Sequence, residues 1–325
     1  MRLSRRLVVS TMAALPFAGL ASAARSALPR ELVLDWATYN PVSLVLKEKG
    51  WVEEELGREG VRVRWVQSLG SNKALEFLNA GSLHFGSTAG AAALLGRLNG
   101  NPIRTFYVFS KPEWTALVTR PDTGITRVED LRGRRVAATK GTDPYIFLLR
   151  ALDRHGLGPK DVQIVLLQHD QGKAALERGD VDAWAGLDPM MAQLELESGA
   201  RLFYRDPEAN SWGVLNAPES LIAQHPELIE RIVALYERGR RHALAHPDEL
   251  RALLAKAARI PEPVAARQLE RTSLADPRVG DAQFAAIAAA GRALQAAGIV
   301  KPEVDVEAAT SALLERRFTA GLPVG

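Results

Sequence analysis

The sequence predicts an α/β protein built from two lobes of similar plan. Strand-like and helix-like segments alternate from about residue 32 to residue 198, which is typical of βαβ units. Two stretches, residues 74–87 and 174–187, repeat one pattern: apolar residues at helical spacing, a glycine, and a short apolar run. The length of 325 residues favours two domains over one. We therefore expect two α/β lobes with mixed, mainly parallel sheets, a cleft between them, and a helical C-terminal region.

The N-terminus has the pattern of a cleaved export signal. Arg2, Arg5 and Arg6 precede an apolar run that ends at Leu20, and small residues up to Ala23 supply a cleavage site. The run is too short for a permanent membrane span. We predict that residues 1–23 are a signal peptide and that the mature protein is periplasmic. The paired arginines fit a twin-arginine signal as well as an ordinary secretory one, and the sequence leaves this choice open.

Composition narrows the possible functions. The formal net charge of +3 falls to zero once the signal peptide, with three arginines and no acidic residue, is removed. This charge gives no support to nucleic-acid binding. The chain contains no cysteine, so it forms no disulfide, carries no lipid-anchored cysteine and has no thiol nucleophile.

Alternation and capping predict the first elements. Strands are expected at residues 32–37, 61–66, 103–109 and 115–118. Asn40 and Pro41 suit a helix N-cap and the first helical position, so a helix is expected from Pro41 to about Lys49. A second helix opens near Ser71 and stops at Gly81.

The middle of the chain continues the alternation. Strands are expected at residues 133–139 and 162–167. Thr126 and Glu129 predict a capping box for a short helix over residues 125–131. A long helix is expected to begin after Gly141 and end near His155, and another covers residues 189–198.

From Pro226 onward the pattern is helical. Helices are expected at residues 226–245, 247–258, 262–271, 282–297 and 305–317. The boundaries we expect for the first lobe are residues 31–114 together with residues 211–325. Residues 115–210 then form the second lobe.

Candidate ligand-binding residues lie where strands pass into helices. Four such junctions carry Asn40, Ser71, Ser87 with Thr88, and Gly141 with Thr142 and Asp143. Ligands of open parallel sheets bind at the carboxyl ends of the strands, where unpaired N–H groups and positive helix termini face them. The same residue types are also the best helix caps, so capping alone explains any single junction. As a set, the four junctions favour a site for a small anion.

Aromatic residues can form the walls of such a cleft. Those at junctions or lobe crossings are Trp114, Tyr145, Trp184 and Trp212, whereas Trp36, Trp51 and Trp65 suit the core or a helix face. Trp184 lies in the middle of a predicted strand, which favours the core. Asp188 precedes a proline at a helix start and suits a cap or a hinge contact.

Sequence signatures of enzymes are weak. The chain has no phosphate-loop motif, no dinucleotide-binding glycine pattern and no nucleophile-elbow serine. Only His242 and His246 have the spacing of a metal pair, and the proline that follows His246 interrupts their helix. We therefore expect no catalytic residue, no metal and no cofactor.

Several of these stretches resemble one family. They are Leu46–Trp51, Ala74–Thr88, Asp130–Ala137, Lys140–Thr142, Gly179–Trp184 and Asp188–Pro189. As a set they resemble the periplasmic solute-binding proteins of ABC importers for aliphatic sulfonates, taurine and nitrate. The resemblance covers about residues 32–245, which is most of the chain that follows the predicted signal peptide.

This resemblance implies a type II periplasmic-binding fold, in which two α/β lobes close over a ligand. It implies a monomeric, non-enzymatic protein that captures a small organic anion or zwitterion and delivers it to a membrane permease with a separate ATPase subunit. By position, the pocket of the family maps onto Asn40, Ser71, Ser87, Thr88, Gly141, Thr142 and Tyr145, with Trp114 near a crossing. Asp143, Trp184 and Asp188 complete the candidate set.

Two positions depart from the family pattern. His84 stands where the pattern usually has an aspartate, whereas Asp182 keeps the acid in the second repeat. Asp143 places a carboxylate where an anion is expected; it suits the amine of a zwitterion, or it caps its own helix. A ligand sensor on the same fold, a pyrimidine or nitrate binder, and an enzyme of the superfamily are the alternatives. The enzymes of this kind use cysteine, which the chain lacks.

Overall fold

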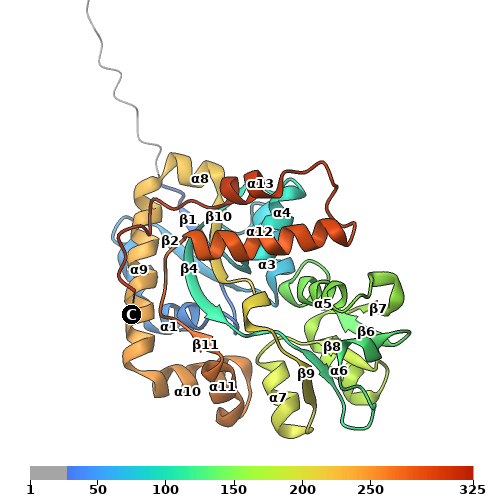
Figure 1. Cartoon of the computed structure of the whole chain (residues 1–325). Helices are drawn as coiled ribbons and strands as arrows, with labels where there is room; N and C mark the ends of the chain where they lie inside the picture. The colour runs from blue at the N-terminus through green and yellow to red at the C-terminus, as the bar shows by residue number, and fades with distance from the viewer. Residues whose placement is uncertain (1–27, 325) are drawn as a thin grey trace, which may run out of the picture.

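The chain forms two bodies that lie side by side, each built around β-sheet (Figure 1). The structure is a computed structural model that describes residues 28–324. The predicted signal peptide, residues 1–23, lies outside the described residues. No helix in the described part of the chain has the length and apolar character needed to cross a bilayer.

The first body contains two sheets. Its strands are β1 (Glu31–Trp36), β2 (Arg62–Gln67), β3 (Gly86–Ala89), β4 (Ile103–Pro112), β10 (Gly213–Pro218) and β11 (Thr272–Ser273). β1 and β2 are parallel, and the other sheet has the order β11-β4-β10-β3 with antiparallel neighbours. A parallel bridge between Leu34 and Phe85 joins β1 to the chain just before β3. We call this body, with its helices, the first lobe.

Helices from both ends of the chain cover the first lobe. They are α1 (Pro41–Lys49), α2 (Trp51–Gly57), α3 (Ser71–Asn79), α4 (Gly90–Leu98), α8 (Glu219–Gln224), α9 (Pro226–Ala245), α10 (Pro247–Ala258), α11 (Glu262–Glu270), α12 (Asp281–Ala296) and α13 (Val306–Leu313). The helical C-terminal region is confirmed. The last helix ends at Leu313 rather than residue 317, because Leu314 pairs with Thr105 and the Glu315 N–H donates to the Thr105 carbonyl.

The second lobe is built on one five-stranded sheet. Its strands are β5 (Leu117–Thr119), β6 (Arg135–Ala138), β7 (Gln163–Leu166), β8 (Ala183–Ala185) and β9 (Arg201–Tyr204), in the order β7-β6-β8-β5-β9. Its helices are α5 (Asp143–Arg154), α6 (His169–Arg178) and α7 (Met190–Glu197). Three short 3₁₀ turns lie at Val128–Leu131, Pro159–Asp161 and Pro207–Ala209.

The five-stranded sheet is mixed, as predicted, but the expectation of mainly parallel pairing is wrong, because the four-stranded sheet is antiparallel throughout. The crossings between the lobes explain where some of the antiparallel pairs occur. Parallel pairs are β1–β2, β6–β7 and β6–β8. β4 leads the chain out of the first lobe and β10 leads it back, so these two neighbours run in opposite directions. β5 and β9 are related in the same way in the second lobe. The predicted lobe boundaries fall within the two crossing segments, residues 113–116 and 205–212.

The predicted capping box of Thr126 and Glu129 is wrong. The turn begins at Val128, and the carboxylate that accepts from the backbone N–H groups of Thr126 and Arg127 belongs to Asp130. Glu129 instead contacts the His155 ring at 2.9 Å. Capping depends on which carboxylate the backbone turns toward the free N–H groups, and two adjacent acids made the sequence ambiguous.

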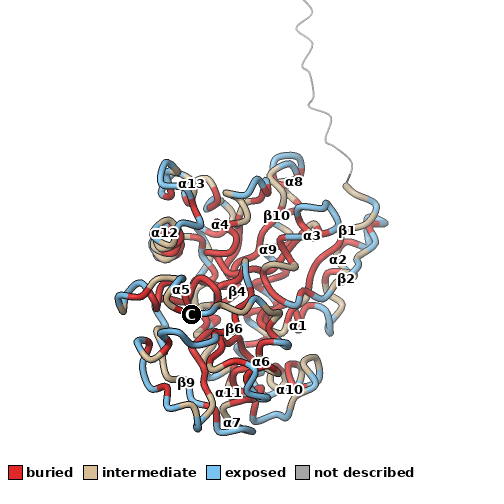
Figure 2. The backbone as a smooth tube through the Cα atoms, turned by 90° about the vertical axis from the view of Figure 1, so that its right-hand side faces the viewer, coloured by how far each residue is buried: buried red, intermediate tan, exposed pale blue. Residues whose placement is uncertain are grey.

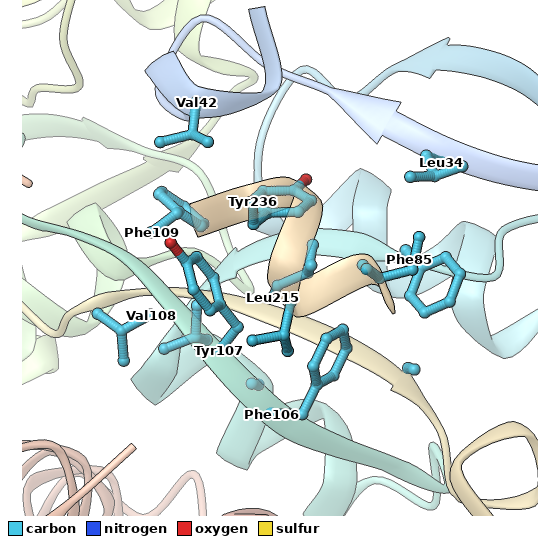
Figure 3. Close-up of a cluster of buried hydrophobic side chains, with 14 of the residues drawn as sticks. Leu34, Val42, Phe85, Phe106, Tyr107, Val108, Phe109, Leu215 and Tyr236 are labelled. Atoms are coloured by element: carbon cyan, nitrogen blue, oxygen red, sulfur yellow. The ribbon is translucent and has the colours of Figure 1, made fainter. Parts of the chain in front are cut away.

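Buried aromatic and aliphatic side chains fill the space between the sheets and helices. In the first lobe, the rings of Phe85 and Phe106 meet edge to face, with their centroids 5.9 Å apart (Figure 3). The ring centroid of Tyr107 lies 5.3 Å from that of Tyr236 in α9. Buried residues run through the middle of both lobes, while exposed residues lie in loops, on outer helix faces and on the outer strands β2 and β7 (Figure 2). α12 packs on both α4 and α5, so a C-terminal helix contacts both lobes (Figure 1).

A candidate ligand site between the lobes

A small cavity lies where the two lobes meet. It is lined by Tyr39, Ser71, Trp114, Thr142, Asp143, Pro144, His169 and Leu187. Its volume of about 10 Å³ leaves room for about one water molecule. The two lobes are therefore closed on each other at this point, and a larger ligand reaches the cavity only when they separate.

A wider groove adjoins the cavity and shares His169 with it. The groove has a volume of about 720 Å³ and receives residues from both lobes. Trp36, Leu69 and Lys73 line it from the first lobe, and Met190 lines it from the second. Leu69 is 63% exposed, which is unusual for a large apolar side chain and marks the groove as an accessible surface.

The N-terminus of α3 faces the cavity from the first lobe. Gly70 precedes the helix, and the backbone N–H groups of Ser71 and Asn72 have no hydrogen-bond partner among the described residues. The Ser71 hydroxyl oxygen accepts from the Ala89 N–H at 2.9 Å, which leaves its own proton free to donate. This terminus therefore offers backbone and hydroxyl donors together with the positive end of the helix dipole.

The N-terminus of α5 faces the same cavity from the second lobe. Gly141 adopts a φ of +80°, which an L-residue rarely adopts, and this turn directs the chain into the helix. The N–H groups of Thr142 and Asp143 have no partner in residues 28–324, so they too are available. The Thr142 hydroxyl donates to the Thr139 carbonyl at 2.6 Å and fixes the turn.

Asp143 neither caps its own helix nor extends freely into the cavity. Its carboxylate accepts from the Trp114 indole N–H at 2.9 Å and from the Ser211 N–H and hydroxyl at 2.9 and 2.6 Å. Trp114 and Ser211 belong to the two crossing segments. Burial raises the pKa of Asp143, and these donors oppose that shift. The helix-cap interpretation is therefore wrong, because Asp143 ties α5 to both crossings.

Other contacts join the two crossing segments directly. The Thr115 N–H donates to the Asn210 side chain at 3.0 Å. Arg205 makes a bidentate ion pair with Glu113, with nitrogen–oxygen distances of 2.6 and 2.7 Å. The crossings thus form one hydrogen-bonded unit next to the cavity, and α5 is attached to it through Asp143.

Four of the eight lining residues were not expected from the sequence, namely Tyr39, Pro144, Leu187 and His169, and of these His169 carries the most chemistry. His169 is a histidine at a strand-to-helix junction. It is the first residue of α6, is 2% exposed, and has an Nε2 atom without a partner in the described residues. Burial lowers the pKa of its imidazole to about 3, so the ring is neutral at pH 7. The signal was present, since residues 162–167 were predicted as a strand and His169 begins the next helix. This junction is a fifth of the same kind, and it was not among the four expected from the sequence.

Asn40, Ser87 and Thr88 do not line the cavity. The Asn40 amide donates to the Ser87 hydroxyl at 2.7 Å, and Ser87 donates its N–H and its hydroxyl to Asp35. Burial raises the pKa of Asp35 to about 6. The Thr88 hydroxyl oxygen accepts from the Asn216 amide at 2.8 Å. These polar groups satisfy one another inside the first lobe.

Four further candidates also lie outside the cavity lining, among them Gly141, whose part is the turn before α5. Trp184 is fully buried in the second-lobe core, and Tyr145 packs among buried side chains on the other face of that sheet. Asp188 accepts from the Ala192 N–H at 2.9 Å, which caps α7, and pairs with Arg271 at 3.2 Å. Burial raises the pKa of Asp188 to about 7. Asp188 thus has the two structural roles that the sequence suggested for it.

In sequence, the chain is similar to proteins that are named as binding proteins. A family model described as NMT1/THI5 like matches residues 41–250. A protein of Escherichia coli (strain K12), provisionally named an aliphatic sulfonates-binding protein, is 28% identical over 228 residues, or 70% of this chain and 72% of that protein. The taurine-binding periplasmic protein of the same strain is 26% identical over 198 residues, or 58% of this chain and 60% of that protein.

Solved structures share the architecture. The alkanesulfonate-binding protein SsuA from Xanthomonas axonopodis pv. citri, bound to MOPS, is similar with a TM-score of 0.80 at 22% identity, covering 90% of this chain and 100% of that one. The predicted periplasmic-binding fold is thereby confirmed. The desulfurization enzyme DSZB is also similar, with a TM-score of 0.64 at 17% identity over 89% of this chain. Binding proteins and an enzyme thus share this fold, so the function must be argued from the site.

Proposed function

Because the chain belongs to the NMT1/THI5-like family, we propose that it is the substrate-binding component of an ABC importer. It captures a small sulfonate or a related anion or zwitterion in the cavity between the lobes. It then delivers this ligand to a membrane permease whose ATPase is a separate subunit. The relatives are named binding proteins, and the chain lacks cysteine, so we propose that it is not an enzyme.

One observation carries this proposal: two helix N-termini with unpaired N–H groups face one cavity from opposite lobes. The lining residues include no lysine and no arginine, so an anion bound there depends on these termini. Each terminus contributes about 0.3–1 kcal/mol to an anion at an exposed position and more when partly buried. Each hydrogen bond to a charged group adds about 1.5–3 kcal/mol. Together these terms favour an anion in the cavity over a neutral molecule of the same size.

The arrangement also supports a capture mechanism. The α3 terminus belongs to the first lobe and the α5 terminus to the second, so both contact the ligand only when the lobes close on it, in a form wider at this point than the present one, whose cavity holds about one water. A ligand that touches both lobes stabilises the closed form by its differential affinity for that form. The proposed contacts are Ser71, Thr142 and His169, with Tyr39 and Trp114 as walls. The proposal excludes five candidates that lie away from the cavity, namely Asn40, Ser87, Thr88, Tyr145 and Trp184.

Location and lobe boundaries complete the proposal. Removal of residues 1–23 on export would leave the mature protein in the periplasm, where the named taurine-binding relative also occurs. We propose the lobe limits expected from the sequence, with residues 115–210 as the second lobe, and a monomeric state.

A ligand screen and one matched pair of variants test the proposed function. Thermal shift with alkanesulfonates, aminosulfonates and nitrate should show stabilisation, because ligand at 100 times its Kd adds about 2.7 kcal/mol to folding stability. Ser71→Ala should weaken binding of the best ligand about tenfold in calorimetry, since it removes a donor to a charged group.

Thr88→Val is the matched control. It also removes a buried hydroxyl of the first lobe, but that hydroxyl bonds to Asn216 away from the cavity, so the ligand Kd should not change. If no member of the screen stabilises the protein, the importer proposal is wrong. If Ser71→Ala and Thr88→Val weaken binding equally, the site assignment is wrong.

A further inference from the structure

We propose that His169 selects ligands that carry a hydrogen-bond donor beside their anionic group. This inference rests on the proposed function and names the ligand class more narrowly. The donor is an ammonium or hydroxyl group attached close to the sulfonate or related anion. His169 accepts this donor through Nε2, while the N-termini of α3 and α5 bind the anionic oxygens.

The hydrogen bonds of the Thr139 hydroxyl decide which nitrogen of the His169 imidazole carries the proton. The Thr139 hydroxyl donates its single proton to the Leu167 carbonyl at 2.8 Å. The same oxygen lies 3.2 Å from Nδ1 of His169, and it can only accept there. Nδ1 of His169 therefore carries the ring proton and donates to Thr139. Nε2 is left with a lone pair and acts as an acceptor.

The Nε2 atom of His169 is buried and has no partner within residues 28–324, and His169 lines both the cavity and the groove. The Oδ1 atom of Asn72 is likewise buried and without a partner in that part of the chain. A Cβ built on Gly70 would lie 2.9 Å from Oδ1 of Asn72 and 3.1 Å from Nε2 of His169. Two unpaired acceptors thus converge on the space that the missing side chain of Gly70 leaves.

The charged side chains that line the cavity and the groove do not pair with the His169 ring. The cavity side presents Asp143, whose carboxylate already accepts three donors. The groove side presents Lys73, Asp170 and Arg259. None of these groups makes a hydrogen bond or ion pair with His169, whose ring is neutral because of its burial. A neutral acceptor repels the oxygens of a plain anion but pairs with an N–H or O–H group. Leaving a buried acceptor unpaired weakens binding, so the site discriminates against ligands that lack the donor.

Calorimetry at pH 7.5 with three ligands of one size tests the inference. The ligands are ethanesulfonate, 2-hydroxyethanesulfonate and 2-aminoethanesulfonate. The two with a donor should bind about tenfold more tightly than ethanesulfonate, which corresponds to one satisfied buried acceptor. In His169→Phe, which keeps a ring but has no acceptor, the difference among the three should shrink to less than threefold.

A second variant guards against a folding defect in His169→Phe. His169→Gln, whose side-chain oxygen accepts a hydrogen bond in place of Nε2, should keep most of the preference for donors. Equal binding of all three ligands by the unmodified protein, or tighter binding of ethanesulfonate, overturns the role of His169 and leaves the importer proposal standing. A preference that survives in His169→Phe, or that is lost in a folded His169→Gln, overturns it as well. If none of the three ligands binds, the result contradicts both this inference and the sulfonate-binding proposal.

Discussion

The two repeated segments, residues 74–87 and 174–187, end their helices in the same way. α3 is followed by Gly81 with a φ of +66°, and α6 by Gly179 with a φ of +81°. Each chain then passes through a short buried strand, β3 or β8, into the next helix. The local hydrogen bonding is also the same at one position where the two residues differ in type, His84 in the first repeat and Asp182 in the second.

His84 and Asp182 make the same pair of bonds to the neighbouring strand. The His84 N–H donates to the Val33 carbonyl at 2.9 Å, and its Nδ1 accepts from the Val33 N–H at 3.0 Å. The Asp182 N–H donates to the Arg135 carbonyl at 2.8 Å, and its carboxylate accepts from the Arg135 N–H at 2.8 Å. The position therefore requires an acceptor two bonds beyond Cβ, and a neutral imidazole meets this need without a charge.

The repeats differ in what holds the chain after each strand. In the first, Ser87 bonds to Asp35, so the junction is secured within its own lobe. In the second, Asp188 pairs with Arg271, which follows α11 of the first lobe and also contacts Glu195. The first junction is thus internal, while the second spans the lobes. The same local pattern is thus followed by a contact within the lobe in the first repeat and by a contact between the lobes in the second.

The largest expected effect comes from breaking the interlobe contact. Arg271→Met would leave the carboxylate of Asp188, which is 1% exposed, without its cation. We expect a loss of about 3 kcal/mol in the free energy of unfolding at pH 8, measured by urea denaturation. Adding Asp188→Asn should restore part of this loss, because the uncompensated charge is removed. A loss below about 0.5 kcal/mol, the range of ordinary surface substitutions, would show that the second junction does not depend on the pair.

A smaller loss of folding stability, equal at the two positions, is expected when the glycines that follow α3 and α6 are replaced. Gly81→Ala and Gly179→Ala each place a side chain in the left-handed region, at a cost of about 1–2 kcal/mol. The added Cβ meets nothing near Gly81 and only the Arg120 guanidinium at 3.5 Å near Gly179, so the two losses should agree within about 0.5 kcal/mol. Gly57→Ala in α2, with open space and no positive φ, is the control and should cost nothing. Clearly unequal losses in thermal or urea unfolding would break the equivalence of the repeats.

The smallest effect is a pH dependence confined to the first repeat. Burial lowers the pKa of His84 below its ordinary value of 6.5. Its contribution to stability is therefore present above pH 6.5 and is lost as the pH falls through the lowered pKa, where protonation destroys the Nδ1 acceptor. His84→Asp should change stability by less than about 0.5 kcal/mol at pH 7.5 but should make the protein relatively more stable at pH 5. Parallel stability–pH curves for the two proteins, from urea titrations, would contradict this role.

Much of the fold was predictable because its signals are local. Glycine stops, proline at first turns and apolar periodicity act over a few residues, and they located α1, α3, α5 and the C-terminal helices. Four of the eight cavity residues were candidates as well: Ser71, Trp114, Thr142 and Asp143. Their junctions lie at the carboxyl ends of strands, where the topology of α/β sheets places ligands.

Three polar candidates lie away from the cavity for a common physical reason. Asn40, Ser87 and Thr88 have the residue types of an anion site, but Asp35 and Asn216, distant in sequence, take up their hydrogen bonds. A polar side chain at a junction is available to a ligand only if no other buried group satisfies it. The sequence lists donors and acceptors, but it does not say which of them pair.

The sequence by itself determined where many of the helices begin and end and that two segments share one plan, because φ preferences and caps depend on neighbours along the chain. Tertiary structure alone decided which junctions meet across the lobes. Asp143 bonds to Trp114 and Ser211, 29 and 68 residues away, and this contact places the α5 terminus opposite that of α3. It also left Nε2 of His169 buried without a partner, because burial and pairing are properties of the packed chain and not of any segment of it.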